Sequence, residues 1–308
     1  MKYIVTGGAG FIGSHIVEEL ALQDHEVVIV DNLFSGKMEN IRPFLKKKNV
    51  TFVKGSITDL PVLKKLSEGA DGIFHEGAIA SVPRSIADPL ASNEANVTGT
   101  LNVLIAARDC GVRKVLFASS SSVYGNTPTL PKHEDMAPNP LSPYAVSKLT
   151  GEHYLKVFSE VYGLKTLSLR YFNVFGPRQD PKSEYAAVIP RFITTILRRE
   201  SPTIYGDGGQ TRDFTYVKDV VQANIRAMES DAEGVFNVAY CKRIDLNELA
   251  GMIMEITGIT VPLVYEPPRT GDVRDSLADI RRAQDAFSYA PEYTVKTGLT
   301  ETIAWYRK

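Results

Sequence analysis

Short apolar runs alternate with longer amphipathic segments through the first half of the chain. Runs rich in β-branched residues predict strands at residues 3–5, 26–30, 51–53, 72–74, 114–118 and 166–170. A helical pattern covers residues 11–22, between the first two strands. Strands that alternate with helices predict a parallel sheet, and their nearly continuous apolar character indicates that helices cover both of its faces.

The pattern changes after residue 172. Residues 189–199 and 245–257 predict helices; Asp245 and Glu248 have the spacing of a capping box, and Gly258 marks the end of the second helix. Residues 213–227 lead back towards the main sheet, and residues 236–238 predict a further strand. We therefore expect a Rossmann-type, doubly wound α/β domain over residues 1–172, with a return segment at about 210–239. Residues 173–209 and 240–308 would form a smaller, interleaved substrate domain.

The segment between the fifth strand and the next helix is rich in proline. Residues 125–143 contain Pro128, Pro131, Pro138, Pro140 and Pro143. Proline removes a backbone donor and fixes φ, so this segment is predicted to be a long, rigid loop without regular structure. Long loops inside compact domains are usually functional.

Composition excludes several classes of protein. The 308 residues contain 35 basic and 36 acidic side chains, so no basic excess favours nucleic acid or an anionic membrane. Cys110 and Cys241 are too few for a disulfide framework or a zinc ribbon, and His133-Glu134 lacks the second histidine of a zinc protease. The N-terminal apolar run is too short for a signal peptide, and no stretch approaches the ~18 apolar residues of a membrane span. We expect a cytoplasmic protein with no metal site.

A glycine-rich segment follows the first strand and opens the first helix. Gly8, Gly10 and Gly13 satisfy the pattern Gly-x-Gly-x-x-Gly, and Gly7, Gly10 and Gly13 satisfy the pattern Gly-x-x-Gly-x-x-Gly. Glycine permits the tight turn and the close approach of a pyrophosphate to the helix N-terminus. Asp31 ends the second strand, where an acid binds the ribose hydroxyls of NAD and repels the 2′-phosphate of NADP. The segment predicts an NAD site, against the alternative of a glycine turn without a ligand.

Tyr144 and Lys148 have the spacing Tyr-x-x-x-Lys. Ser142 is a suitable N-cap and Pro143 suits the first helical position, so both side chains are expected on one face of a helix, near its start. The lysine charge and the helix dipole are expected to lower the pKa of the tyrosine and make it a general base. The alternative is a surface tyrosine and lysine on an amphipathic helix.

Four consecutive serines, residues 119–122, follow the fifth strand. In an open parallel sheet, ligands bind beyond the carboxyl ends of the strands, so these hydroxyls are candidate donors to a substrate oxygen. A turn-forming cluster is the alternative.

Taken together, these motifs resemble the extended short-chain dehydrogenase/reductases that act on nucleotide sugars. The matching segments, in order, are residues 6–14, 120–125, 142–148, 170–177, 212–214 and 269–272. The resemblance extends over essentially the whole chain. It implies tightly bound NAD in the first domain and a UDP-sugar held by the second.

The resemblance also implies roles for individual residues. Tyr144 would be the base, Lys148 would bind the nicotinamide ribose, and Ser120 would be the catalytic serine. The implied cofactor-binding residues are Gly7, Gly10, Phe11, Ile12, Gly13, Asp31, Asn32, Ser56, Ile57, Gly77, Ala78, Asn96, Tyr144, Lys148 and Phe172. The implied substrate-binding residues are Ser81, Ser121, Ser122, Asn173, Val188, Thr203, Tyr205, Arg212, Arg269, Asp272 and Ser276.

The serine cluster also narrows the implied reaction to epimerisation at C4. Dehydratases of this family carry Thr-Asp-Glu where this chain has residues 120–122, and the decarboxylases usually keep the glutamate. Hydroxyls cannot replace carboxylates in proton transfer at C5 and C6.

One small residue indicates which sugar the resemblance implies. Ser276 stands where glucose-restricted epimerases carry a bulky tyrosine, which leaves room for an N-acetyl group. We expect action on UDP-GlcNAc/UDP-GalNAc and on UDP-Glc/UDP-Gal. The alternatives are a UDP-glucuronate 4-epimerase, which needs a cation such as Arg84 or Arg178 at the sugar 6-position, and an NAD-binding sensor without catalysis.

The resemblance further implies a homodimer. Helices over residues 100–108 and 144–162 match the pair that forms a four-helix interface in the family. Val157, Phe158 and Val161 would lie on that interface or in the core.

Overall fold

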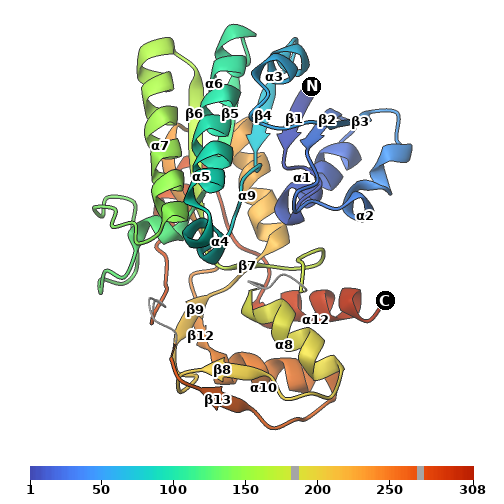
Figure 1. Cartoon of the computed structure of the whole chain (residues 1–308), viewed down its shortest axis with the longest axis vertical. Helices are drawn as coiled ribbons and strands as arrows, with labels where there is room; N and C mark the ends of the chain where they lie inside the picture. Colours follow the sequence, from blue (N-terminus) through green and yellow to red (C-terminus); the bar gives the residue numbers. More distant parts are fainter. Residues whose placement is uncertain (182–186, 269–273) are drawn as a thin grey trace.

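A seven-stranded parallel sheet forms the larger of two lobes (Figure 1). In this computed structural model, residues 1–181, 187–268 and 274–308 are described. The sheet order is β11-β6-β5-β4-β1-β2-β3. Its strands are β1 (Lys2–Thr6), β2 (Glu26–Asp31), β3 (Val50–Lys54), β4 (Gly72–His75), β5 (Lys114–Ser120), β6 (Lys165–Tyr171) and β11 (Gly234–Val238). The chain therefore reverses direction across the sheet between β1 and β4, which is the topological switch point of a doubly wound fold.

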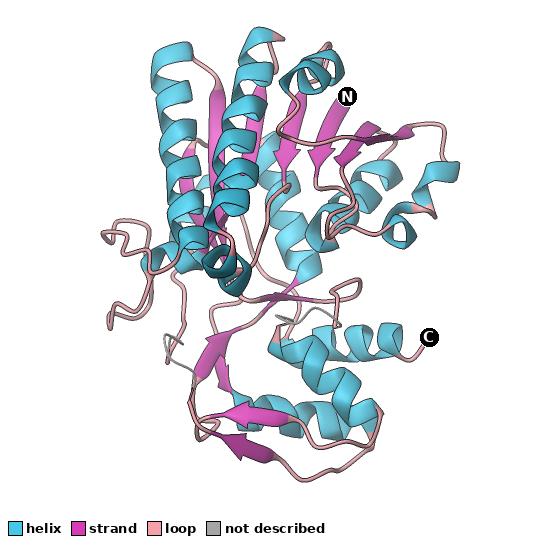
Figure 2. Cartoon of the chain, in the orientation of Figure 1, coloured by secondary structure: helices cyan, strands magenta, loops and turns pink. Residues whose placement is uncertain are grey.

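Helices cover both faces of this sheet (Figure 2). One layer contains α1 (Phe11–Leu22) and α9 (Val217–Glu229), and the other contains α3 (Leu60–Ser67), α6 (Gly99–Asp109) and α7 (Pro143–Tyr162). Successive side chains of a strand point to opposite faces. Tyr3 and Val5 accordingly pack with the α1/α9 layer, whereas Ile4 packs with the α3/α6/α7 layer. Burial on both faces explains why the strands are continuously apolar.

The smaller lobe lies beyond the carboxyl ends of the strands (Figures 1 and 2). Its helices are α8 (Val188–Leu197), α10 (Leu246–Thr257) and α12 (Val295–Tyr306), and its strand pairs are β8 (Thr203–Tyr205) with β13 (Val264–Glu266) and β9 (Thr211–Asp213) with β12 (Arg243–Asp245). A separate core that includes Phe192, Leu249 and Ile303 holds this lobe together. The short strands β7 (Val174–Phe175) and β10 (Thr215–Tyr216) pair where the chain passes between the lobes.

Short elements occupy the edges of the large lobe. They are α2 (Met38–Ile41), α4 (Val82–Ala87), α5 (Pro89–Asn93), α11 (Arg281–Phe287), two 3-10 turns (Phe44–Lys46 and Ser121–Tyr124) and one turn of π-helix (Glu94–Thr98) that joins α5 to α6. Residues 125–142 of the proline-rich segment form no helix and no strand, as predicted, and Pro143 is the first residue of α7. The segment is fixed at Lys132, whose backbone N–H donates to Leu277 and whose carbonyl accepts from Asp279, both at 2.8 Å.

The predicted fold class is confirmed, and each predicted strand is present within one or two residues. The predicted helices at residues 189–199 and 245–257 correspond to α8 and α10. Residues 213–227 contain little strand: most of them form α9, which delivers the chain to β11 at the edge of the sheet. No helix in the described part of the chain is long and apolar enough to cross a membrane.

Candidate active site

The glycine loop lies at the switch point between β1 and β4. Gly7 follows β1 with a positive φ of 65°, a conformation that favours glycine. A Cβ at this position would lie 2.7 Å from the Cα of Gly77, which follows β4. A Cβ on Gly13 would lie 2.4 Å from the carbonyl oxygen of Gly7. Glycine is therefore required here by direct backbone contact, and the first N–H groups of α1 stay open to a phosphate.

Asp31 is placed at the carboxyl end of β2, beside this loop. Its Oδ2 accepts from the N–H of Ala9 at 3.0 Å and its Oδ1 from the N–H of Leu33 at 2.7 Å. Burial raises the pKa of this carboxyl, and the two backbone donors oppose the rise. The carboxylate thus has a fixed orientation on the wall of the adjacent cavity, where its remaining lone pairs suit a ribose diol.

A cavity of about 390 Å³ extends from this loop. Most of the predicted cofactor residues line it: Gly7, Gly10, Phe11, Ile12, Gly13, Asp31, Asn32, Ser56, Ile57, Gly77 and Ala78. Asn96 is buried behind the wall instead, where its amide accepts from the N–H of Ile79 at 2.7 Å and donates to Ser147. Asn96 therefore orders the loop after β4. These residues fit a dinucleotide: a glycine cradle for phosphates and an acid for a ribose.

Substitution of Gly13 tests the cradle. We expect Gly13→Ala to abolish retention of NAD and to destabilise the protein by about 2 kcal/mol, because the new methyl group overlaps the Gly7 carbonyl. Gly251→Ala is the matched control, since it also lies in a helix and a Cβ there meets no atom within 4 Å. Thermal unfolding and the absorbance of released cofactor measure both effects. Equal behaviour of the two variants would contradict the cradle.

Tyr144 and Ser120 meet where α7 begins beside the carboxyl end of β5. Ser142 caps α7 by accepting from the N–H of Ala145 at 3.2 Å, and the N–H of Tyr144 donates to Ser85 at 3.0 Å. The Tyr144 phenol lies close enough to Ser120 for the serine hydroxyl to lower its pKa, and both residues line the same cavity. The two backbone contacts fix the start of α7, so the predicted base and the predicted serine are brought together.

The expected lowering of the Tyr144 pKa is wrong for this structure. Burial raises the pKa of the phenol, the Ser120 hydrogen bond lowers it, and the charge of Glu76 raises it. Lys148 does not offset the burial, because its ammonium donates to the carbonyl of Ala118 at 2.7 Å and lies 5.9 Å from the centre of the tyrosine ring. Burial lowers the pKa of Lys148 to about 8, so it is largely cationic at neutral pH.

A buried ion pair that the sequence did not reveal supports this region. Glu152, one turn after Lys148 on α7, binds Arg170 of β6 at 2.7 Å with both side chains almost fully buried. The same carboxylate accepts from the hydroxyl of Ser119 at 2.5 Å. Glu152 thus connects α7 to β6 through Arg170 and to the end of β5 through Ser119, next to Ser120.

A second cavity, of about 530 Å³, lies next to this contact and shares Phe11, Ile12 and Ala80 with the cofactor cavity. The predicted residues Ser120, Ser121, Ser122, Tyr144, Phe172, Asn173, Arg212 and Ser276 line it. The hydroxyl of Ser122 is buried without a protein partner, which leaves it for a ligand. The Asn173 amide donates to the Ser276 hydroxyl at 3.5 Å.

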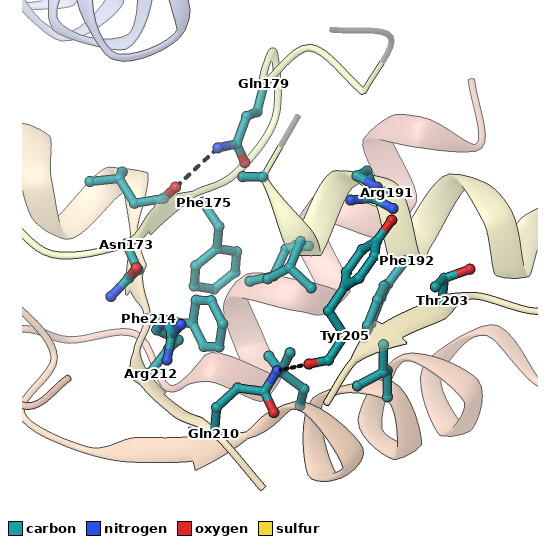
Figure 3. Close-up of a pocket in the computed structure, with 16 residues that line it drawn as sticks. Asn173, Phe175, Gln179, Arg191, Phe192, Thr203, Tyr205, Gln210, Arg212 and Phe214 are labelled. Carbon is teal, nitrogen blue, oxygen red and sulfur yellow. Dashed lines mark hydrogen bonds between the residues drawn. The ribbon is translucent and has the colours of Figure 1, made fainter. Parts of the chain in front are cut away.

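A third cavity, of about 260 Å³, shares Asn173 and Arg212 with the second (Figure 3). The predicted residues Val188, Thr203 and Tyr205 line it. The Tyr205 ring faces the guanidinium of Arg191, 5.9 Å from the ring centre, while Gln210 donates to the Tyr205 carbonyl at 2.7 Å. Three adjoining cavities therefore run from the glycine loop, past Tyr144, into the smaller lobe.

Some expected contacts lie elsewhere. Arg269 and Asp272 lie outside the described residues. Ser81 caps α4, accepting from the N–H of Arg84 at 3.3 Å. Arg84 stacks over Phe34, and Arg178 lines the cofactor cavity, bound to Glu18. Neither arginine lines the second cavity, so the cation required by the glucuronate alternative is not supplied by them.

Three comparisons identify the family. The NAD dependent epimerase/dehydratase family model matches residues 3–239. A putative UDP-glucose 4-epimerase of Methanocaldococcus jannaschii is 40% identical, over 99% of this chain and 98% of that protein. Among solved structures, the UDP-N-acetylglucosamine 4-epimerase of Methanobrevibacter ruminantium M1, in complex with UDP-N-acetylmuramic acid, is 47% identical with a TM-score of 0.96, covering 99% of this chain and 98% of that one.

The UDP-glucose 4-epimerase of Thermus thermophilus, solved in complex with NAD, is 38% identical with a TM-score of 0.90, covering 100% of this chain and 99% of that one. These matches confirm the resemblance drawn from the motifs, the isomerase activity and the dependence on NAD. The chain belongs to the NAD-dependent epimerase/dehydratase family and, within it, to the UDP-sugar 4-epimerases.

Proposed function

We propose that this protein interconverts UDP-GlcNAc and UDP-GalNAc and also accepts UDP-Glc and UDP-Gal. The observation that carries the proposal is Ser276 on the wall of the second cavity, a small side chain beside Asn173. Its backbone N–H donates to Thr211 at 3.1 Å, which fixes its position. A serine there leaves the volume that an acetamido group needs, and its hydroxyl offers a polar partner.

In this proposal the positive charge of bound NAD would offset the burial that raises the pKa of Tyr144, so that the phenol can ionise. The phenolate then takes the proton of the sugar 4-hydroxyl, and Ser120 donates a hydrogen bond to the developing carbonyl oxygen. NAD held by the glycine loop and Asp31 would supply the group that accepts and donates a hydride at C4. Lys148 contributes a positive charge that favours the phenolate, since it is cationic below a pKa of about 8. The buried Glu152–Arg170 pair keeps these groups in register.

The third cavity is proposed to hold the UDP moiety. Val188 at the start of α8 and Thr203 to Tyr205 of β8 offer an apolar slot with backbone groups for a uracil. Arg212 lies between this slot and the second cavity, the place of a diphosphate. We assign Arg269 and Asp272 to the diphosphate and the ribose on the resemblance alone.

A comparison of substrates tests the proposal. Purified protein is incubated with UDP-GlcNAc, UDP-Glc or UDP-glucuronate without added NAD, and the anomeric protons are followed by NMR. We expect new signals of UDP-GalNAc and UDP-Gal. Turnover of UDP-glucuronate alone would refute the proposed substrate and favour the glucuronate epimerase, and no turnover of any of them would favour the sensor.

We further propose a homodimer formed through α6 and α7. Val157 and Val161 on α7 are 46% and 65% exposed, and Tyr162 is 50% exposed, whereas Phe158 is buried in the core. An apolar stripe of this kind on one long helix is typical of a subunit interface. Sedimentation velocity is expected to give twice the mass of the 33.9 kDa chain, and a monomer at micromolar concentration would refute the interface.

A further inference from the structure

Glu76 is a half-buried acid that the proposed reaction does not use. It follows β4 directly, and its backbone N–H donates to the carbonyl of Thr6 in β1 at 3.2 Å. It therefore lies at the switch point, between the glycine loop and α7. Its side chain lines the cofactor cavity, beside Gly77 and Ala78.

The carboxyl group of Glu76 is held by a network that separates the first two cavities. Its Oε1 accepts from the Tyr171 hydroxyl at 2.9 Å, and that hydroxyl accepts from the Asn224 amide at 2.8 Å. Tyr171 lines the second cavity, whereas Glu76 lines the first. The Tyr171 hydrogen bond thus fixes the position of the carboxyl, in a residue that lines the cofactor cavity.

The charged and titratable groups that face Glu76 come from three elements. Lys148 and Tyr144 face Glu76 from α7, and Tyr171 faces it from β6. His75, the last residue of β4, is buried, and burial lowers the pKa of its imidazole to about 3, so His75 is neutral. Burial raises the pKa of Glu76 to about 7, and the Tyr171 hydrogen bond and the Lys148 charge oppose the rise.

We infer that Glu76 sets the preference of this protein for the oxidised cofactor, because its carboxylate on the cofactor-cavity wall lies within electrostatic reach of the positively charged nicotinamide. The nicotinamide must lie near Tyr144 for C4 chemistry, and Glu76 acts on the phenol of Tyr144 through its charge. An anion at this place attracts the cationic oxidised ring and has no such interaction with the neutral reduced ring. Glu76 thus acts on the cofactor through its charge and takes no part in the proton transfer. This inference rests on the binding of NAD and not on which sugar is the substrate.

The preference for the oxidised cofactor is expected to depend on pH. Above pH 7 the carboxyl is ionised and favours the oxidised cofactor. As the pH falls through about 7 the carboxyl is protonated and the preference is lost; a bound nicotinamide cation shifts this loss to somewhat lower pH. Lys148 titrates in the same range, and the charge of Glu76 raises its pKa, so Glu76→Gln lowers the pKa of Lys148 further. A less cationic Lys148 would strengthen the preference for the oxidised cofactor, so this change opposes the expected loss and cannot mimic it.

A partition experiment measures the preference without turnover. The experiment uses holoprotein with the substitution Tyr144→Phe, so that no phenolate charge contributes to the preference. The protein is equilibrated with mixtures of NAD⁺ and NADH and passed through rapid gel filtration. The ratio of NAD⁺ to NADH on the protein is then compared with the ratio in solution. Glu76→Gln is added to this background. We expect the preference for NAD⁺ to fall about ten-fold at pH 8 and to change little at pH 5.5.

Two further variants separate charge from structure. Tyr171→Phe removes the hydrogen bond but keeps the carboxyl, so the preference should persist. Glu134→Gln replaces a carboxyl that is 4% exposed, accepts from the N–H of Asn237 and lies outside the cavity, so it should change nothing. The inference is overturned if Glu76→Gln leaves the preference for NAD⁺ unchanged or lowers it equally at both pH values. It is also overturned if Tyr171→Phe lowers the preference as much as Glu76→Gln does. Should Glu76→Gln not fold, the parent is compared with Lys148→Met in the same background: in both proteins the preference must rise several-fold from pH 5.5 to pH 8, and a rise that disappears with Lys148 overturns the inference.

Discussion

Replacement of Tyr144 by phenylalanine is expected to lower kcat for every UDP-sugar by about 10³-fold or more, within the range that a positioned general base contributes. The variant loses the hydroxyl that meets Ser120 but keeps the ring, and the backbone contacts that hold the start of α7 are unaffected. Substrate binding should change little, because the residues proposed to hold the nucleotide line the third cavity and do not include Tyr144. Steady-state kinetics and titration with UDP-sugar measure the two effects.

The matched control is Tyr154→Phe, the same change on α7 at a half-buried position that lines none of the three cavities. Its activity should equal that of the parent protein. If Tyr144→Phe retains more than about a tenth of the parent kcat, a different group removes the proton and the assignment of Tyr144 as base is wrong.

Replacement of Ser276 by tyrosine is expected to separate the two pairs of substrates. The phenol would extend from a fixed backbone position into the second cavity, beside Asn173, and occupy the volume proposed for the acetamido group. We expect kcat/KM for UDP-GlcNAc to fall by at least about 100-fold, the scale on which pocket shape discriminates substrates. The value for UDP-Glc should fall only a few-fold.

The glucose pair is the internal control for this variant, since it shares the nucleotide and the reaction at C4. An equal loss of both activities would show that Ser276 supports the site as a whole. In that case the choice between N-acetylated and plain sugars would depend on other residues of the cavity.

The sheet and the glycine loop could be predicted because their signals are local. A strand buried on both faces is apolar at every position, and Gly13 is required by contacts with Gly7 and Gly8 within one short segment. The tyrosine–serine contact was predictable for a related reason. Ser120 ends β5 and Tyr144 begins α7, and ligands meet parallel sheets at these carboxyl ends.

Properties set by contacts far apart in the sequence could not be predicted in the same way. The pKa of Tyr144 depends on burial and on Glu76, which is 68 positions earlier in the chain, so the expected lowering was wrong. Asn96 remains a predicted cofactor residue, and the hydrogen bond that its side chain accepts from the N–H of Ile79, from the π-helical turn at Glu94–Thr98, is a contact that the motif does not reveal. Glu76 carries no motif, and only the structure shows that it faces the cofactor cavity.

The central claim is that this protein inverts C4 by removing and returning the same hydride, with Tyr144 handling only the hydroxyl proton. The most direct measurement uses UDP-GlcNAc carrying deuterium at C4, incubated with the protein in ordinary water and analysed by NMR and mass spectrometry. The account predicts UDP-GalNAc that retains the deuterium at C4. Loss of the label to solvent would contradict it, because C4 would then be inverted by proton exchange with water.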